Sequence, residues 1–178
     1  GLIGPTNVVG DPFAVPALRP EEVAALRQAA AEASVVLEAL GTDPEVFGLL
    51  HADLHHGNVL YRGGQALPID FDDCGTGWFL QDPVATLSRL AWRPDFAELR
   101  AAWFAGYGEL RSYSEAEMGA MGAMQLLDRL VGVAWLGSRG DVPQVRGLFR
   151  PWIEGSVDMA ARWSAGDRGF PLKTGAAP

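Results

Sequence analysis

The sequence has few of the residues that disulfides and nucleic-acid sites require. Its single cysteine, Cys74, excludes a disulfide within the chain and fits a reducing compartment. Of the 14 basic residues, all but Lys173 are arginines, and the formal net charge is -8. Because phosphate binding needs clustered basic side chains, a chain this acidic is not expected to bind nucleic acid.

Long apolar runs are also missing. A helix needs about 18 to 20 consecutive apolar residues to cross a bilayer, and the longest candidate, residues 130–137, is far shorter. The first residues do not combine a basic stretch with an apolar one, so no secretory signal is visible. We therefore expect no membrane partner and a cytoplasmic location.

Most of the 178 residues show helical periodicity, and 48% of them are hydrophobic, enough for one globular domain. The first helix has Pro20 in its first turn and Gly41 at its end, and a capping box of Ser114 and Glu117 opens a later one. The predicted helices are 20–41, 82–92, 95–110, a helix that runs from Ser114 to about 136, and 143–163.

The periodicity changes between residues 47 and 71. Two short apolar runs, near 58–61 and 66–70, flank Gly63 and Gly64, which is typical of a tight β-hairpin. The chain is predicted to be helical again after residue 77. These elements define an α+β, mainly helical fold with one short hairpin.

Two polar clusters flank this hairpin. The stretch "HADLHHGNVL" holds all three histidines together with Asp53 and Asn58, and twelve residues after Asn58 comes "DFDD", which starts at Asp70. A hairpin brings the residue before its first strand close to the residue after its second, so we expect Asn58 and Asp70 to meet at one edge. Their oxygens suit Mg²⁺, and Asp53 could orient a hydroxyl beside that ion, as phosphoryl transfer requires.

The two motifs together, "HADLHHGNVL" and "PIDFDDCGTGWFLQDPVATL", resemble those of the aminoglycoside phosphotransferase and choline kinase family. That family has the protein-kinase-like fold, and Ala52 stands where protein kinases have arginine. The resemblance covers residues 51 to about 90, and the helical character of 94–165 is similar to the helical subdomain of the family. It implies that the hairpin carries the catalytic and metal-binding loops of a kinase-like C-terminal lobe.

The resemblance also implies roles for the acidic and amide residues. Asp53 is expected to be the catalytic base, and Asn58 and Asp70 are expected to bind Mg²⁺. Asp70 is preferred to Asp72 because it matches the position directly after the strand, which leaves Asp72 as an auxiliary or supporting residue.

Supporting roles fall to three further residues. His51 matches a histidine that braces the catalytic loop, and His55 falls where relatives often carry histidine, close to phosphate. Asp82 matches an aspartate that supports the catalytic loop, although a helix N-cap before Pro83 would also explain it. His56 has no role that we can assign.

One part of a working kinase is not found in the sequence. Catalysis requires a phosphate-covering loop and a strand lysine that holds the nucleotide phosphates. Lys173 lies on the wrong side of the motifs, so the chain has no nucleotide lysine and we expect a C-terminal lobe without its nucleotide lobe, inactive alone. The expected segments are an extended stretch 1–19, a catalytic core 20–93, a helical subdomain 94–165 and a tail 166–178.

The favoured function is ATP-dependent transfer of a γ-phosphoryl group to a hydroxyl of a small molecule, with Mg²⁺ as cofactor. Nucleotide and hydroxyl acceptor are the expected partners. One alternative is a catalytically inactive kinase-like module that binds or regulates. A second is a metal-dependent hydrolase built on His51, Asp53 and His55, although no histidine remains elsewhere to complete a nitrogen-rich site.

Overall fold

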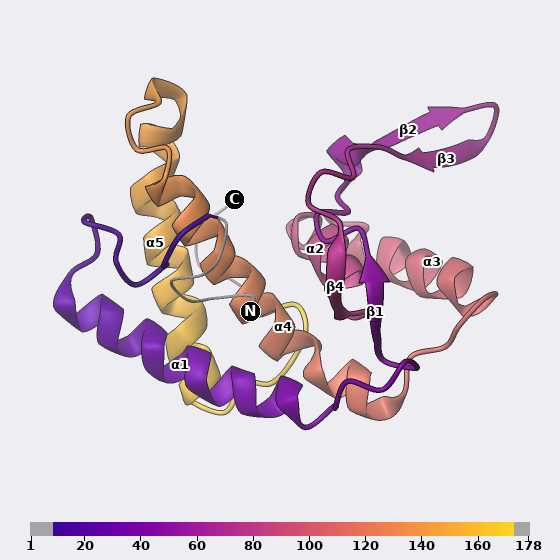
Figure 1. Cartoon of the computed structure of the whole chain (residues 1–178), viewed down its shortest axis with the longest axis horizontal. Helices are drawn as coiled ribbons and strands as arrows, with labels where there is room; N and C mark the ends of the chain where they lie inside the picture. The colour runs from indigo at the N-terminus through magenta and orange to yellow at the C-terminus, as the bar shows by residue number, and fades with distance from the viewer. Residues whose placement is uncertain (1–8, 173–178) are drawn as a thin grey trace.

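The protein was analysed as a computed structural model that describes residues 9–172 (Figure 1). The leading residues 1–8 and Lys173 lie outside the described part. The helices are α1 (Pro20–Glu38), α2 (Gln81–Ser88), α3 (Phe96–Gly108), α4 (Glu115–Gly137) and α5 (Pro143–Ser164). The strands are β1 (Phe47–Leu50), β2 (Val59–Arg62), β3 (Gln65–Pro68) and β4 (Gly75–Trp78), and a 3₁₀ turn covers His56–Asn58. The expected α+β, mainly helical class is confirmed.

The main core lies between three long helices. α1, α4 and α5 pack against one another, and α2 packs on α4 (Figure 1). α1 presents small residues, including Ala30 and Ala33, and α4 presents Met121 and Met124, all of them buried. Small side chains on one helix let a neighbouring helix approach closely, and the flexible methionines fill the remaining gaps. Among the helices in the described range, none is both long and apolar enough to cross a membrane.

The hairpin predicted from the sequence is present. β2 and β3 pair antiparallel from Val59 opposite Pro68 to Arg62 opposite Gln65. The turn residues Gly63 and Gly64 have φ angles of 59° and 79°, values that glycine adopts without strain. The hairpin extends away from the helices (Figure 1), so its side chains are largely exposed.

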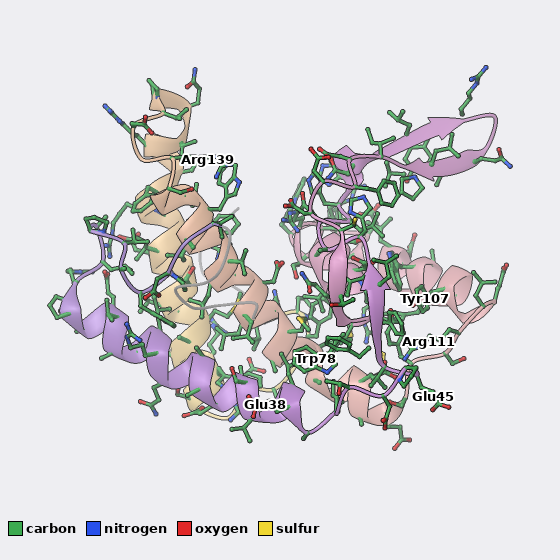
Figure 2. The ribbon with its side chains drawn as sticks, viewed as in Figure 1. Glu38, Glu45, Trp78, Tyr107, Arg111 and Arg139 are labelled. Carbon is green, nitrogen blue, oxygen red and sulfur yellow. The ribbon has the colours of Figure 1, made fainter. Side chains whose placement is uncertain are left out.

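A second sheet was not predicted. β1 pairs antiparallel with β4, which the sequence analysis placed in a loop and the start of a helix. β4 has the sequence Gly-Thr-Gly-Trp. Glycine is depleted in β-strands, so residue propensities do not predict a strand here. The pairing also explains Gly48, because a Cβ atom there would lie 2.7 Å from the Phe79 ring. Trp78 then donates from Nε1 to the carbonyl of Gly41, 2.8 Å away, which ties this sheet to the end of α1 (Figure 2).

Helix limits differ slightly from the prediction. The first helix ends at Glu38 and not at 41, and α2 ends at Ser88 and not at 92. The capping box at the start of α4 is confirmed, since Ser114 accepts from the Glu117 amide and the Glu117 carboxylate accepts from the Ser114 amide. The capping box at Ser114 therefore marked a helix start correctly, whereas the apolar periodicity continued beyond the ends of the first two helices.

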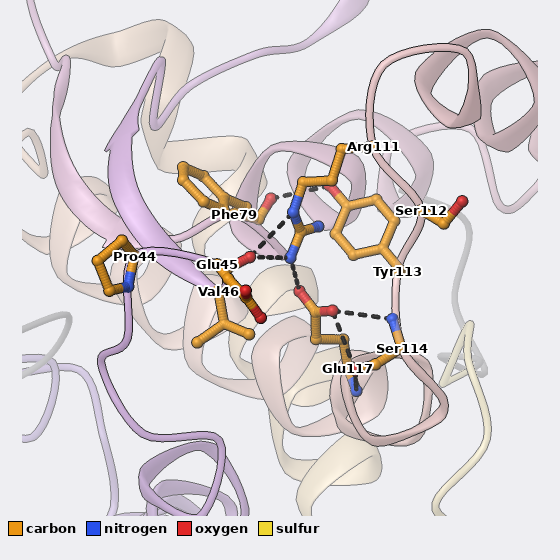
Figure 3. A pocket seen from close by; sticks show the side chains of 9 residues that line it. All are labelled: Pro44, Glu45, Val46, Phe79, Arg111, Ser112, Tyr113, Ser114 and Glu117. Atoms are coloured by element: carbon orange, nitrogen blue, oxygen red, sulfur yellow. Dashed lines mark hydrogen bonds and ion pairs between the residues drawn. The ribbon is translucent and has the colours of Figure 1, made fainter.

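Arg111 joins the α3–α4 connection to the loop before β1. Its Nη2 lies 2.5 Å from both the Glu45 carbonyl oxygen and the Glu117 carboxylate (Figure 3). Its guanidinium also lies over the rings of Phe79 and Tyr113. These residues line an open hollow of about 510 Å³ at the start of β1. The predicted catalytic residues lie in residues 51–58, which follow the other end of β1, so we assign this hollow a structural role.

We expect Arg111→Met to lower the free energy of unfolding by about 2–3 kcal/mol, because it leaves the buried Glu117 carboxylate without its cation. Urea denaturation measures this. Arg93→Met is the matched control, since Arg93 pairs with Asp95 at the surface and its loss should cost under about 0.5 kcal/mol. Similar losses in the two variants would contradict a structural role for the Arg111 contacts.

Glu22 links α1 to α5. Its carboxylate is buried, accepts from Arg150 of α5, and lies 2.6 Å from Nη2 of Arg19. The hydrogen bond from Arg150 is the main reason that the pKa of Glu22 is lowered to about 2, with Arg19 adding to the effect and burial opposing it. The carboxylate is therefore charged in the folded protein at any moderate pH.

Because the pKa of Glu22 is lower in the folded state, its ion pairs stabilise the protein above pH 4.5 and this stabilisation is lost as the pH falls to about 2. Both arginines are partly exposed, so we expect a contribution of about 1–2 kcal/mol after solvent screening. The free energy of unfolding of the wild type should exceed that of Glu22→Gln by this amount at pH 7, and the difference should shrink by pH 2.5. A difference that does not change with pH would contradict the assignment.

Candidate active site

His51 fixes the start of residues 51–58, the predicted catalytic loop. It follows β1, its side chain is buried, and its Nε2 lies 2.9 Å from the carbonyl oxygen of Ile69. A carbonyl only accepts, so Nε2 carries the proton. The ring also packs against Phe71, with centroids 4.6 Å apart. His51 therefore connects the loop to the segment after β3 and is not free to bind a metal through Nε2.

Asp82 holds the backbone of the same loop. One carboxylate oxygen accepts from the His51 amide at 3.1 Å and the other from the Ala52 amide at 3.0 Å. Burial raises the pKa of Asp82, and the two amide hydrogen bonds oppose that change. Leu80 precedes the first residue of α2, so the N-cap interpretation of Asp82 is wrong. Its carboxylate instead stabilises Ala52, whose φ of 69° is unfavourable for a residue with a Cβ atom.

Two further side chains of α2 contact the loop. Gln81 donates from Nε2 to the carbonyl of Ala52 at 3.3 Å, and the Thr86 hydroxyl donates to the carbonyl of Leu54 at 2.5 Å. α2 in turn packs on α4. The position of the catalytic loop is therefore set by a helix that belongs to the main core.

We expect Asp82→Ala to lower the free energy of unfolding by about 2–3 kcal/mol, because two backbone amides lose their acceptor while Ala52 keeps its unfavourable conformation. Urea denaturation with Asp73→Ala as control measures this, since Asp73 is exposed and its removal should change stability by less than about 0.5 kcal/mol. Asp82→Asn retains one acceptor and should fall between the two. A loss no greater than that of the control would show that the two amides do not need Asp82.

Asp53 is oriented from three sides. Asn58 donates from Nδ2 to the Asp53 backbone carbonyl at 3.0 Å and to its Oδ2 at 3.2 Å. Nη2 of Arg89 donates to Oδ1 at 3.3 Å, and Nε2 of His55 lies 3.5 Å from Oδ2. The side chain remains partly exposed. A fixed carboxylate with an open side has the geometry needed to accept a proton from a bound hydroxyl.

The hairpin brings Asn58 and Asp70 to one edge. The Ile69 amide donates to the Asn58 carbonyl at 2.9 Å, which continues the ladder of β2 and β3, and Asp70 follows directly. Asp70 is exposed and has a φ of 62°. Since the amide nitrogen of Asn58 is used on Asp53, its side-chain oxygen is left for a cation. Two oxygen ligands suit Mg²⁺, which takes the rest of its shell from water and phosphate. Asp72 is also exposed, in the turn that follows.

The other two histidines do not form a metal site. Nδ1 of His55 accepts from the Gly57 amide at 3.0 Å, which leaves its proton on Nε2, toward Asp53. Burial lowers the pKa of His55, against the opposing charge of Asp53, and His56 is exposed. Within residues 9–172, no three His, Cys, Asp or Glu side chains are grouped so as to hold a metal ion. The structure therefore does not support the hydrolase alternative.

The sequence analysis missed Arg89 and Asp128. Arg89 follows the last residue of α2 and pairs with Asp53. It lies seven residues, about two helical turns, after Asp82, a spacing that could have placed both on the side of α2 that faces the catalytic loop. Asp128 is on α4 and is close enough for its charge to interact with those of Arg89 and Asp53. No sequence signal points to Asp128.

The fold and these loops define a class of protein. Residues 11–121 match the phosphotransferase enzyme family, and the chain belongs to that family. The resemblance read from the two motifs is thereby confirmed.

Particular relatives agree with this assignment. Stress response kinase A of Salmonella choleraesuis (strain SC-B67) is 30% identical over 157 residues, which are 86% of this chain and 45% of that protein. Amicoumacin kinase of Bacillus subtilis (strain 168) is 41% identical over 58 residues, 33% of this chain and 17% of that protein. The chain therefore spans less than half the length of these relatives.

Solved structures show the kinase-like fold. A microcompartment-associated aminopropanol kinase superposes with a TM-score of 0.74 at 30% identity, over 87% of this chain and 49% of that chain. The amicoumacin kinase hAmiN, in complex with AMP-PNP, Ca²⁺ and Ami, superposes with a TM-score of 0.67 at 23% identity, over 83% and 48% of the two chains. The expected kinase-like fold is confirmed.

Proposed function

We propose that this chain is the acceptor-binding and catalytic lobe of an ATP-dependent kinase that phosphorylates a hydroxyl group of a small molecule. The observation that carries the proposal is the environment of Asp53, whose carboxylate is fixed by Asn58 and Arg89 beside the edge where Asn58 and Asp70 meet. In this proposal residues 9–172 form the C-terminal lobe, and the strand lysine that would hold the nucleotide phosphates is not among them.

Each side chain of the site has one role in the proposed reaction. Asp53 accepts the proton of the acceptor hydroxyl as the hydroxyl oxygen bonds to the γ-phosphorus of ATP. The bond from that phosphorus to the β–γ bridging oxygen breaks, ADP leaves, and Asp53 returns the proton to solvent. The side-chain oxygens of Asn58 and Asp70 would hold Mg²⁺, which when bound offsets the negative charge of the phosphates. His51 and Asp82 position the loop and take no part in proton transfer.

The relatives support this proposal. The hAmiN structure contains a nucleotide analogue together with a divalent cation, the pair of ligands that the Asn58 and Asp70 edge would receive. Both solved neighbours are kinases whose names give small molecules, aminopropanol and amicoumacin. Among the relatives that span most of the chain, one is named a serine/threonine protein kinase, so the proposal of a small-molecule acceptor draws its support from the two solved neighbours alone.

The separate roles of Asp53 and Asp70 can be tested in the full-length protein that contains this chain. We expect Asp53→Ala to lower kcat by ~10²–10⁴-fold, the usual contribution of a general base, while the Kd of Mg²⁺–ATP changes less than about threefold. Asp70→Ala should raise that Kd by about tenfold or more, because a metal ligand is lost. Single-turnover kinetics and calorimetry measure the two quantities.

Asp73→Ala, a change in the same exposed turn as Asp72, is the control and should leave both quantities unchanged. Equal loss of nucleotide binding in the Asp53 and Asp70 variants would contradict the division of roles. A wild-type protein that binds Mg²⁺–ATP but transfers no phosphoryl group to any hydroxyl would favour the non-catalytic module. Residues 1–178 alone should show little turnover, because positioning of the nucleotide phosphates supplies most of this catalysis.

A further inference from the structure

Three side chains lie against the Asp53 carboxylate, and they come from different parts of the fold. Asn58 donates to Oδ2 at 3.2 Å, and Nε2 of His55 lies 3.5 Å from the same oxygen. Both residues belong to the loop that carries Asp53, so they fix the carboxylate only relative to that loop. Nη2 of Arg89 donates to Oδ1 at 3.3 Å from the end of α2. Among the described residues, Arg89 alone bonds this carboxylate from outside the loop.

Arg89 also differs from the other two side chains in charge. Asn58 is a neutral amide. Nδ1 of His55 accepts from the Gly57 amide, and burial lowers the pKa of His55, so its ring is uncharged at neutral pH. A guanidinium is always charged, and a hydrogen bond between charged groups is stronger than one between neutral groups. Because this ion pair is partly exposed, it contributes more to orientation than to stability.

The guanidinium of Arg89 is itself held in place. Its Nη1 donates to the Ala85 carbonyl at 2.7 Å, and the Arg89 carbonyl accepts from Nε1 of Trp92 at 3.1 Å. The planar group therefore bonds α2 through one nitrogen and Asp53 through the other, which a flexible lysine side chain does not reproduce with a fixed geometry. Since α2 packs on α4, Arg89 connects the Asp53 carboxylate to the main core.

The two oxygens of Asp53 are unequally occupied. A carboxylate oxygen can accept about two hydrogen bonds. Oδ2 faces both Asn58 and His55, whereas Oδ1 has only the 3.3 Å bond from Arg89. Oδ1 therefore has room for a further donor, which in phosphoryl transfer is the hydroxyl of the acceptor.

We propose that Arg89 is a positioning residue for phosphoryl transfer, which holds the Asp53 carboxylate so that Oδ1 accepts the proton of the acceptor hydroxyl. This role rests on the proposed function of Asp53 as the base, but its own content is that the base depends on the end of α2. Arg89 acts through Asp53 and takes no part in bond making. A displacement of about 1 Å can lower the rate of an enzyme ~10²-fold, so the contact affects kcat.

A double-mutant cycle in the full-length protein that contains this chain tests the role. The reaction followed is hydrolysis of Mg²⁺–ATP, in which water replaces the acceptor hydroxyl. Arg89→Met should lower kcat ~10–10²-fold, with the KM of Mg²⁺–ATP within about threefold of the wild type. Arg89→Lys should lose less, because it keeps the charge but not the planar group. In the Asp53→Ala background, Arg89→Met should change kcat less than about twofold, since its effect passes through Asp53.

Arg93→Met is the matched control. It removes a nearby exposed arginine that pairs with Asp95, so kcat should stay at the wild-type value. Circular dichroism checks that each variant folds. If Arg89→Met does not fold, Arg89→Lys takes its place in the cycle, with a smaller loss of the same kind.

Crystal structures of the wild type and the Arg89→Met variant give a readout that does not depend on activity. The Asp53 carboxylate should have one orientation in the wild type, with Oδ1 bonded to Arg89. In the variant it should rotate or adopt a second orientation, while Asn58 and His55 keep their positions because they belong to the same loop.

The outcomes separate this inference from the proposed function. An Arg89→Met variant with the kcat of the wild type, a loss that persists in full in the Asp53→Ala background, or an unchanged Asp53 orientation would overturn the positioning role and leave the kinase intact. Reorientation of Asp53 in a protein whose wild type neither hydrolyses ATP nor transfers a phosphoryl group to any hydroxyl would support the positioning of Asp53 and contradict the kinase.

Discussion

The hydrogen bonds from the His51 and Ala52 amides to Asp82 are the interaction on which the rest of the site depends. The catalytic loop has little regular structure of its own, so its backbone amides need acceptors from elsewhere. A single carboxylate supplies two of them from the first turn of α2. α2 packs on α4, which belongs to the main core. The orientation of Asp53 is therefore set by contacts with the main core and not by the exposed hairpin.

Within residues 9–172, two residues with a Cβ atom have left-handed backbone conformations, and both lie in the proposed active site. Ala52, with φ of 69°, precedes Asp53, and Asp70, with φ of 62°, is the proposed metal ligand. Such conformations cost of order 1 kcal/mol and persist only where surrounding contacts fix them. For Ala52 the fixing contacts are those of Asp82 and Gln81. For Asp70 they are the bond between Ile69 and Asn58 and the bond between His51 and Ile69.

The sequence predicted the features that arise from local chemistry. The capping box at Ser114, the glycine turn of the hairpin and the approach of Asn58 to Asp70 all follow from residues a few positions apart or from one tight turn. β4 was not predictable in this way, because a strand of two glycines, a threonine and a tryptophan is stabilised by pairing with β1. Arg111 was missed for the same reason, since its acceptor Glu45 is 66 residues away and only the fold brings them together.

The arginines show how an acidic chain arranges its charges. Arg19 and Arg150 neutralise Glu22 between α1 and α5, and Arg111 neutralises Glu117 where α3 meets α4. In both places a guanidinium neutralises a buried carboxylate. The ion pair explains why the fold can bury that carboxylate.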